Sequence, residues 1–387
     1  MNEHLESRNR TRSAISLVGL TITLWTAGFT AFAQSAILPA RSASIPTEIQ
    51  IAQSSEAIAT FKRGEILYNA GQYKEALVEF DRTVQQDPKF ATAWRLRAST
   101  LAQLKNYSDA MTSISKAVGS APRDPDVWAT QGDLYRDQGD YTSAITSYKV
   151  ALRFMPRERQ RDRTEVALSL SFSVFALGYQ AAIANEQAVA TQQYEAAVSA
   201  YDDAISEAQG GDKDLLSQSW LRRGEVLRRL KRYDEALSSF KQAVQLNSNL
   251  AEGWFRCGFA LQLLGRDREA VGAYDKAVNL DSNYAEAWNN RGFSLYNQKK
   301  LSEAIQSFNR AIGGEVRNNW GGETPFDRAR PWYGIADALF LQGCYTKAEI
   351  AYQQALKLNP KFEEAQKRSQ ELKRYLGQPS NSVCQNY

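Results

Sequence analysis

Apolar and small side chains recur along most of the chain with a period of 34 residues. In the segment that begins at residue 285, they stand at positions 4, 8 and 11 of the period and again at positions 20, 24 and 27. Each triplet falls on one stripe of an α-helix, because residues three and four apart share a helix face. The pattern therefore predicts two amphipathic helices per period, joined by a short turn.

The type of residue at each position is repeated as well. Trp288 and Gly292 represent positions 4 and 8 of the unit at 285, and Ala304 and Phe308 represent positions 20 and 24. Small residues at positions 8 and 20 let two helices approach closely, and the rings at positions 4 and 24 fill the space around them. Positions 15 to 17 often read Gly-x-Tyr, which turns the chain, and a proline near position 32 ends the second helix.

Seven segments follow this pattern, beginning at residues 57, 91, 125, 217, 251, 285 and 329. One hairpin of two helices cannot bury its apolar faces alone, but stacked hairpins can. The pattern resembles the tetratricopeptide repeat family over well more than half of the chain. The resemblance implies an all-α fold: a right-handed α-solenoid of stacked helix-turn-helix units, with a concave groove lined mainly by first helices and a C-terminal capping helix.

The expected order of segments follows from the pattern and its interruptions. It is a signal peptide at 1–33, a flexible lead-in at 34–56, three repeats at 57–158, a degenerate repeat with a long first helix at 159–216, three repeats at 217–318, an insertion at 319–328, a last repeat at 329–362, a capping helix at 363–376 and a tail at 377–387. In the degenerate repeat, Leu168, Leu170 and Phe172 alternate as in a strand. Leu168, Phe172 and Phe175 in the same segment are also spaced as on one face of a helix. Inside a solenoid we expect a helix here and not a strand.

The first 33 residues differ from the rest in composition. Three arginines precede a charge-free apolar stretch at 14–33, which ends in Ala-Phe-Ala. This order is typical of a secretory signal peptide, and its composition is bacterial in style. We expect a mature chain that starts at Gln34 in an exported compartment: the periplasm, the thylakoid lumen or the extracellular medium. No stable membrane span is expected after cleavage; the alternative is an uncleaved membrane anchor formed by residues 14–33.

The residues available for chemistry are few. The only histidine, His4, lies in the leader, so histidine-dependent catalysis and most zinc sites are excluded from the mature chain. The three cysteines have no C-x-x-C spacing, and no glycine-rich phosphate-binding motif occurs. We therefore expect no enzyme activity, no metal and no cofactor. The alternative is carboxylate chemistry in the groove, since acidic residues are abundant on the helix faces.

The resemblance implies instead a non-catalytic scaffold or adaptor that binds a peptide or helix of a partner protein, as assembly factors do. A net charge of +4 from 47 basic and 43 acidic residues gives no reason to expect nucleic acid. A structural adaptor that forms its own homo-oligomer is the alternative within this class. The lysine and asparagine with which part of the family reads C-terminal carboxylates, at positions 5 and 9, are absent from the corresponding places.

Groove candidates follow from positions 5, 9 and 12 of the last three units, where the family contacts its partners. They are Phe255, Phe259, Gln262, Asn289, Phe293, Tyr296, Tyr333 and Phe340. Family members mostly carry small or polar residues at position 9, so two phenylalanines there stand out. We expect Phe259 and Phe293 to lie side by side as a cleft for an apolar anchor, with the amides of Asn289 and Gln262 beside them.

Basic residues concentrate in one first helix, where Arg222, Arg228 and Arg229 form a candidate patch for an acidic partner or an anionic surface. The alternative is a solvated helix face, partly paired with Glu225 and Asp234.

The cysteines and the insertion yield two further expectations. Cys344 lies in the turn of the last repeat and Cys384 in the tail, so an oxidising compartment would allow a disulfide between them; the alternative is two free thiols. Cys257 is expected to be a buried core residue. The insertion carries Trp320 and Phe326 and is either a functional loop or a tolerated surface excursion.

Overall fold

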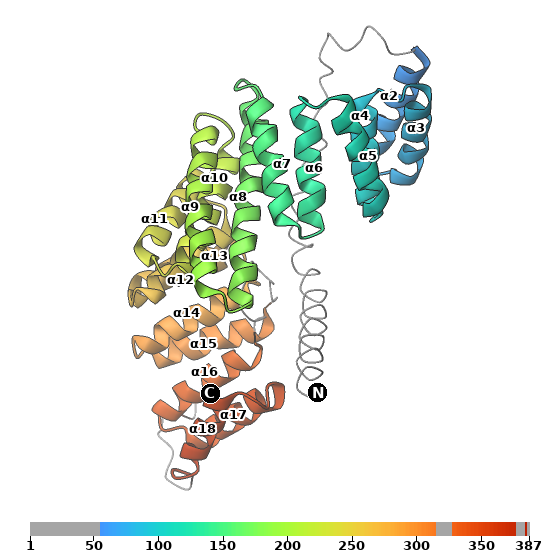
Figure 1. Ribbon diagram of the computed structural model, residues 1–387. Helices are drawn as coiled ribbons and strands as arrows, with labels where there is room; N and C mark the ends of the chain where they lie inside the picture. Colours follow the sequence, from blue (N-terminus) through green and yellow to red (C-terminus); the bar gives the residue numbers. More distant parts are fainter. Residues whose placement is uncertain (1–54, 315–326, 377–383, 385–387) are drawn as a thin grey trace, which may run out of the picture. The chain divides into compact units, whose positions relative to one another are not determined.

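The computed structural model describes residues 55–314, 327–376 and 384 of the chain. The predicted signal peptide, nearly all of the predicted lead-in and most of the insertion at 319–328 lie outside the described residues. Within the described part there are 17 helices and no strand. Consecutive helices pack against each other as hairpins (Figure 1). The prediction of an all-α solenoid is confirmed, while the handedness of its superhelix stays a prediction.

The chain divides into two compact units, Met1–Ala196 and Ala197–Tyr387, here called the N-terminal and C-terminal units. The N-terminal unit holds α2 (Ser55–Asn69), α3 (Tyr73–Gln86), α4 (Ala91–Gln103), α5 (Tyr107–Ser120), α6 (Pro125–Asp137), α7 (Tyr141–Phe154) and α8 (Gln160–Ile183). Helix α9 (Gln187–Ala208) contains the boundary. The C-terminal unit continues with α10 (Lys213–Arg229), α11 (Tyr233–Leu246), α12 (Ala251–Leu263), α13 (Asp267–Leu280), α14 (Ala285–Asn297), α15 (Leu301–Gly313), α16 (Ala329–Leu341), α17 (Tyr345–Leu358) and α18 (Glu363–Leu372).

Six hairpins close through contact between a glycine at position 8 of the first helix and an aromatic ring at position 24. A Cβ added at these glycines would lie only 2.5 to 2.8 Å from ring atoms. The pairs are Gly64–Phe80, Gly132–Tyr148, Gly178–Tyr194, Gly224–Phe240, Gly258–Tyr274 and Gly292–Phe308. In the repeat at 91, where the smaller Ile114 replaces the ring, Ala98 takes the place of the glycine, and both are fully buried. In the last repeat Ala336 stands at position 8 with Tyr352 at position 24, and both are fully buried, so position 8 carries a small residue in every repeat.

The turn of every hairpin passes through a residue with positive φ at position 15. Four of these residues are glycines, and the others are Lys105, Asn185, Lys231 and Lys299, with φ between 59° and 63°. The left-handed conformation ends the first helix at the same place in each repeat. The left-handed conformation is therefore kept even in the three repeats that carry a lysine at position 15, although lysine does not favour it.

In four repeats, tryptophan at position 4 ties the first helix to the connector before it. The indole nitrogens of Trp94, Trp128, Trp254 and Trp288 donate to the carbonyl oxygen six residues earlier, at 2.8 to 2.9 Å. Gln366 of α18 makes the equivalent bond to the carbonyl oxygen of Pro360 at 2.6 Å. Helix α18 therefore begins in the manner of a further first helix.

The segment at 160–183 is helical and not a strand, as expected, and α8 extends over 24 residues. It is also the one helix in the described part of the chain that is long and apolar enough to cross a membrane. Half of its most apolar window is buried inside the protein, as in the core helix of a soluble fold.

The C-terminal end of the stack is closed covalently. Cys344 and Cys384, the pair named from the sequence, form a disulfide across 40 residues, with Cα atoms 5.4 Å apart. Both sulfur-bearing side chains are buried, and Lys347 Nζ donates to the carbonyl oxygen of Cys384 at 2.6 Å. The bond ties residue 384 to the turn between α16 and α17. Cys257 is a buried free thiol, and burial raises its pKa to about 12.

The glycine contact can be tested by adding one methyl group. Gly292→Ala is expected to lower the free energy of unfolding by about 1–3 kcal/mol, because the new Cβ would lie 2.6 Å from the ring of Phe308. Gly272→Ala is the matched control, since nothing lies within 4 Å of its Cβ and alanine favours the helix by about 0.5–1 kcal/mol. Urea unfolding of both variants measures the difference. Equal stabilities would show that the contact is not required.

Candidate functional site

The predicted groove residues lie on α12, α14 and α16, but they do not form one open surface. Phe255 is 8% exposed and Asn289 is 2% exposed, so neither is available to a partner. The other six are half-buried: Phe259, Gln262, Phe293, Tyr296, Tyr333 and Phe340. Each of these six makes a specific contact inside the C-terminal unit, which decides how much of it a partner can reach.

Rings at position 5 pack against the ring that directly precedes the next first helix. The centroid distances are 4.7 Å for Phe61–Phe90, 5.0 Å for Phe255–Tyr284 and 5.1 Å for Tyr333–Phe362. Position 5 therefore points into the seam between neighbouring repeats. Burial therefore contradicts the prediction that Phe255 and Asn289 line an open groove. For the half-buried Tyr333 it stays a prediction.

The two phenylalanines at position 9 have different surroundings. Phe259 stacks on Phe255 with a centroid distance of 6.3 Å, and the guanidinium of Arg228 lies 5.6 Å from its ring. Phe293 packs edge-on against the core ring of Phe308, at 4.9 Å. No ring contact joins Phe259 to Phe293 in this described part of the chain, so the expected side-by-side pair is not formed. Both rings remain half-exposed.

A tyrosine at position 24 takes a polar partner from the first helix. The hydroxyl of Tyr148 donates to Asp133 at 2.8 Å and that of Tyr274 to Gln262 at 3.0 Å. In the last repeat the hydroxyl of Tyr352 donates to Asp337. Gln262 therefore serves the buried tyrosine hydroxyl, and its amide oxygen is not the open acceptor that the sequence suggested.

Asp337 connects four helices near the C-terminus. It is 6% exposed and accepts from Tyr352 of α17, from Tyr296 of α14 at 3.3 Å and from Arg368 of α18 at 3.4 Å. Burial and the neighbouring Asp337 carboxylate raise the pKa of Tyr296 to about 12. The Tyr296 ring is thus held in one orientation by its hydroxyl while part of it stays exposed.

The capping segment covers the predicted site at Phe340. The ring of Tyr375 lies edge-on to Phe340 at 5.3 Å, and the guanidinium of Arg368 lies 5.9 Å from it. Tyr345 packs against the same ring at 5.7 Å. Phe340 therefore contributes to the interface between the last repeat and its cap, and its place in the groove stays a prediction.

The arginines of α10 form a buried charge cluster with Glu225, which is 5% exposed. Arg228 Nη2 donates to Glu225 at 2.7 Å, Arg256 Nη1 donates to it at 3.3 Å and Arg229 Nε lies 3.8 Å away. Arg222 belongs to the same surroundings, where loss of hydration lowers the pKa of its guanidinium. These residues make neither an open basic patch nor a solvated face. They fasten α10 to α12 through Arg256.

The electrostatics of the cluster keep Glu225 charged. Burial by itself would raise the pKa of this carboxyl group, but Arg256 and Arg228 outweigh it and lower the pKa to about 2. Removing the carboxylate would leave several guanidinium groups in a poorly hydrated place.

Among the residues that the structure describes, no group of three or more His, Cys, Asp or Glu could hold a metal ion.

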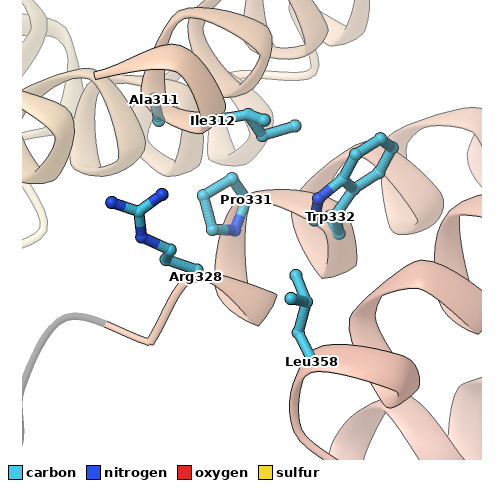
Figure 2. A pocket seen from close by; sticks show the side chains of 6 residues that line it. All are labelled: Ala311, Ile312, Arg328, Pro331, Trp332 and Leu358. Carbon is cyan, nitrogen blue, oxygen red and sulfur yellow. The ribbon is translucent and has the colours of Figure 1, made fainter. Parts of the chain in front are cut away.

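A hollow that sequence reasoning missed lies at the ends of α15, α16 and α17. It has a volume of about 190 Å³ and is lined by Ala311, Ile312, Arg328, Pro331, Trp332 and Leu358 (Figure 2). Its walls are mostly apolar, with the guanidinium of Arg328 at one side. The available signal was Arg328 itself, which stands where neighbouring repeats place Leu250, Tyr284 or Phe362.

Comparison with known proteins gives one family. Models described as tetratricopeptide repeat match residues 61–125, 106–158, 215–283, 285–313 and 329–362. Among solved structures, a crystal structure of MamA protein shares 18% identity and a TM-score of 0.39, covering 49% of this chain and 90% of the other. A second MamA crystal structure shares 19% identity and a TM-score of 0.39, with coverages of 47% and 92%. No curated protein matches the chain.

Glu225→Gln tests the charge cluster. Because the folded-state pKa lies below the unfolded value near 4.5, the carboxylate contributes stability above about pH 4.5 that is lost as the pH falls toward 2. We expect the free energy of unfolding of the variant at pH 7 to be about 3 kcal/mol lower than that of wild type. This difference should shrink below pH 4.5. Unfolding curves across this pH range measure it.

The control for that experiment is Glu235→Gln. Glu235 pairs with Arg232 at 2.6 Å, but its side chain is 49% exposed, so its removal should barely change stability at any pH. If the two variants behave alike, the buried cluster does not fasten α10 to α12.

Proposed function

The chain belongs to the tetratricopeptide repeat family, a family of protein–protein interaction scaffolds, and we propose that its C-terminal unit binds a partner segment across α12 and α14. The observation that carries this proposal is the set of partly accessible rings on two first helices, Phe259 of α12 and Phe293 and Tyr296 of α14, here called the aromatic row. All three side chains are half-exposed, and each is held by an internal contact. Rings that are already fixed lose little entropy on binding, which favours them as anchors.

The chemistry of the row describes its partner. Phe259 offers a ring face between Phe255 and Arg228, and Phe293 and Tyr296 extend the apolar surface along α14. A peptide or amphipathic helix with apolar anchor residues suits this surface. The repeats are generally non-catalytic in this family, and the proposed role is that of a scaffold, for example in assembling other proteins.

We further propose that the protein works in an exported, oxidising compartment. The basic and apolar leader that ends in Ala-Phe-Ala supports this proposal. The pairing of Cys344 with Cys384 supports it independently, because such bonds persist outside the reducing cytosol.

Phe259→Ser tests the aromatic row. Truncating an anchor ring is expected to weaken partner binding at least about tenfold. Phe259 is preferred to Phe293, because Phe293 also packs on the core ring of Phe308. Immobilised mature protein recovers partners from the native exported fraction, mass spectrometry identifies them, and a recovered partner is then titrated by calorimetry.

Ile350→Ser is the matched control for this titration, since Ile350 is 54% exposed on α17, outside the row. Both variants must keep the wild-type unfolding midpoint. A partner that binds the Phe259 variant as tightly as the control would place the site elsewhere.

Export and disulfide formation are checked on one sample. Protein from the exported fraction should begin at Gln34, and a non-reducing digest should contain peptides of Cys344 and Cys384 linked together. Recovery of the full-length chain from the cytosol, or a free Cys384 thiol in exported protein, would refute the proposal.

A further inference from the structure

The hollow beside Trp332 marks a place where the last repeat departs from the others. In four other repeats, the indole nitrogen at position 4 donates to a carbonyl oxygen of the preceding connector. For Trp332 the carbonyl oxygen six residues earlier belongs to residue 326, which lies outside the described residues. The ring nitrogen of Trp332 lies on the side that faces Pro331 and Leu358 (Figure 2), so a donor borders the hollow.

The residue before the first helix also differs. Phe90 and Tyr284 occupy this place in other repeats, and both are at most 2% exposed. In the last repeat the place is taken by Arg328, which is exposed. Its guanidinium makes no ion pair with the described residues, and the nearby Asp327 accepts instead from Asn359 at 2.6 Å and from the backbone of Ala329 at 2.8 Å. A positive charge therefore stands at the rim, and no residue in the described part of the chain pairs with it.

The remaining walls are apolar. Ile312, at position 28, is half-exposed, whereas Val244 and Val278 at the same position of other repeats are 3% exposed. Leu358 on the opposite wall is 51% exposed. The hollow holds about 190 Å³, and an apolar cavity of about 150 Å³ can accept a benzene molecule. One aliphatic or aromatic side chain is thus of suitable size.

We infer that this hollow, here called the α16 pocket, binds an extended peptide of a partner protein in which an apolar side chain is followed by an acidic one. The apolar side chain lies against Ile312, Pro331 and Leu358. The acidic side chain pairs with Arg328. The pocket lies on α15 to α17, apart from Phe259, so this inference does not depend on the aromatic row.

The test uses full-length mature protein and an acetylated, amidated hexapeptide with Leu-Asp at its centre. The indole signal of Trp332 is followed by nitrogen-15 NMR and assigned with Trp332→Phe. A saturable shift of this signal is expected. Replacing the peptide's Leu by Ser should abolish the shift, and Arg328→Gln should weaken binding about tenfold, as for a lost charge-assisted bond.

Arg330→Gln is the matched control, because Arg330 is exposed one turn or less away but does not line the pocket. It should bind the peptide like wild type. The inference fails if no shift occurs, if both arginine variants lose affinity equally, or if acetate alone reproduces the shift. It also fails if the peptide binds only after residues 317–324 are deleted, since the chain itself would then fill the pocket.

Discussion

The contact between the glycine at position 8 and the ring at position 24 is the constraint on which the rest of the molecule depends. It sets how closely the two helices of a hairpin approach, because even one methyl group at Gly224 or Gly258 would overlap the ring of Phe240 or Tyr274. The ring at position 24 is fully buried in these repeats. If that ring is a tyrosine, its hydroxyl is buried as well and must be given an acceptor.

That requirement reaches the surface on which a partner would bind. Asp133, Gln262 and Asp337 come from first helices, yet each accepts from a buried tyrosine hydroxyl. Position 5 is used in the same way, since its rings seal the seam to the next repeat. In α10 the carboxylate at position 9, Glu225, forms ion pairs with Arg228 and Arg256. The face that a family pattern assigns to partners is therefore largely employed in holding the stack together, while the aromatic row keeps part of its apolar surface accessible.

The last repeat differs from the others because no further repeat covers its outer face. Helix α18 places Gln366 where other first helices place tryptophan, and Tyr375 and Arg368 cover Phe340. The polar composition of α18 suits an end that faces solvent, and the disulfide to Cys384 adds a covalent tie at the same end. On the other side of this repeat, Arg328 replaces an apolar residue and leaves a charged, partly open pocket. Both features arise where the regular repetition of the chain is interrupted.

The sequence by itself determined the hairpins, their boundaries and the pairing of small with large residues, because these depend on contacts at fixed spacing within one repeat. The same regularity identified the core position of Cys257 and the disulfide partners. It could not determine which side of a helix remains open, since that depends on side chains contributed by neighbouring repeats. Phe255 was misassigned because Tyr284 packs on it from the next connector, and Phe340 shares its ring surface with Tyr375 of the cap. Arg228 and Arg229 looked like a surface patch until Arg256, from the following repeat, joined them around Glu225. Local periodicity specifies a repeat, whereas exposure and charge pairing are decided only when repeats are stacked.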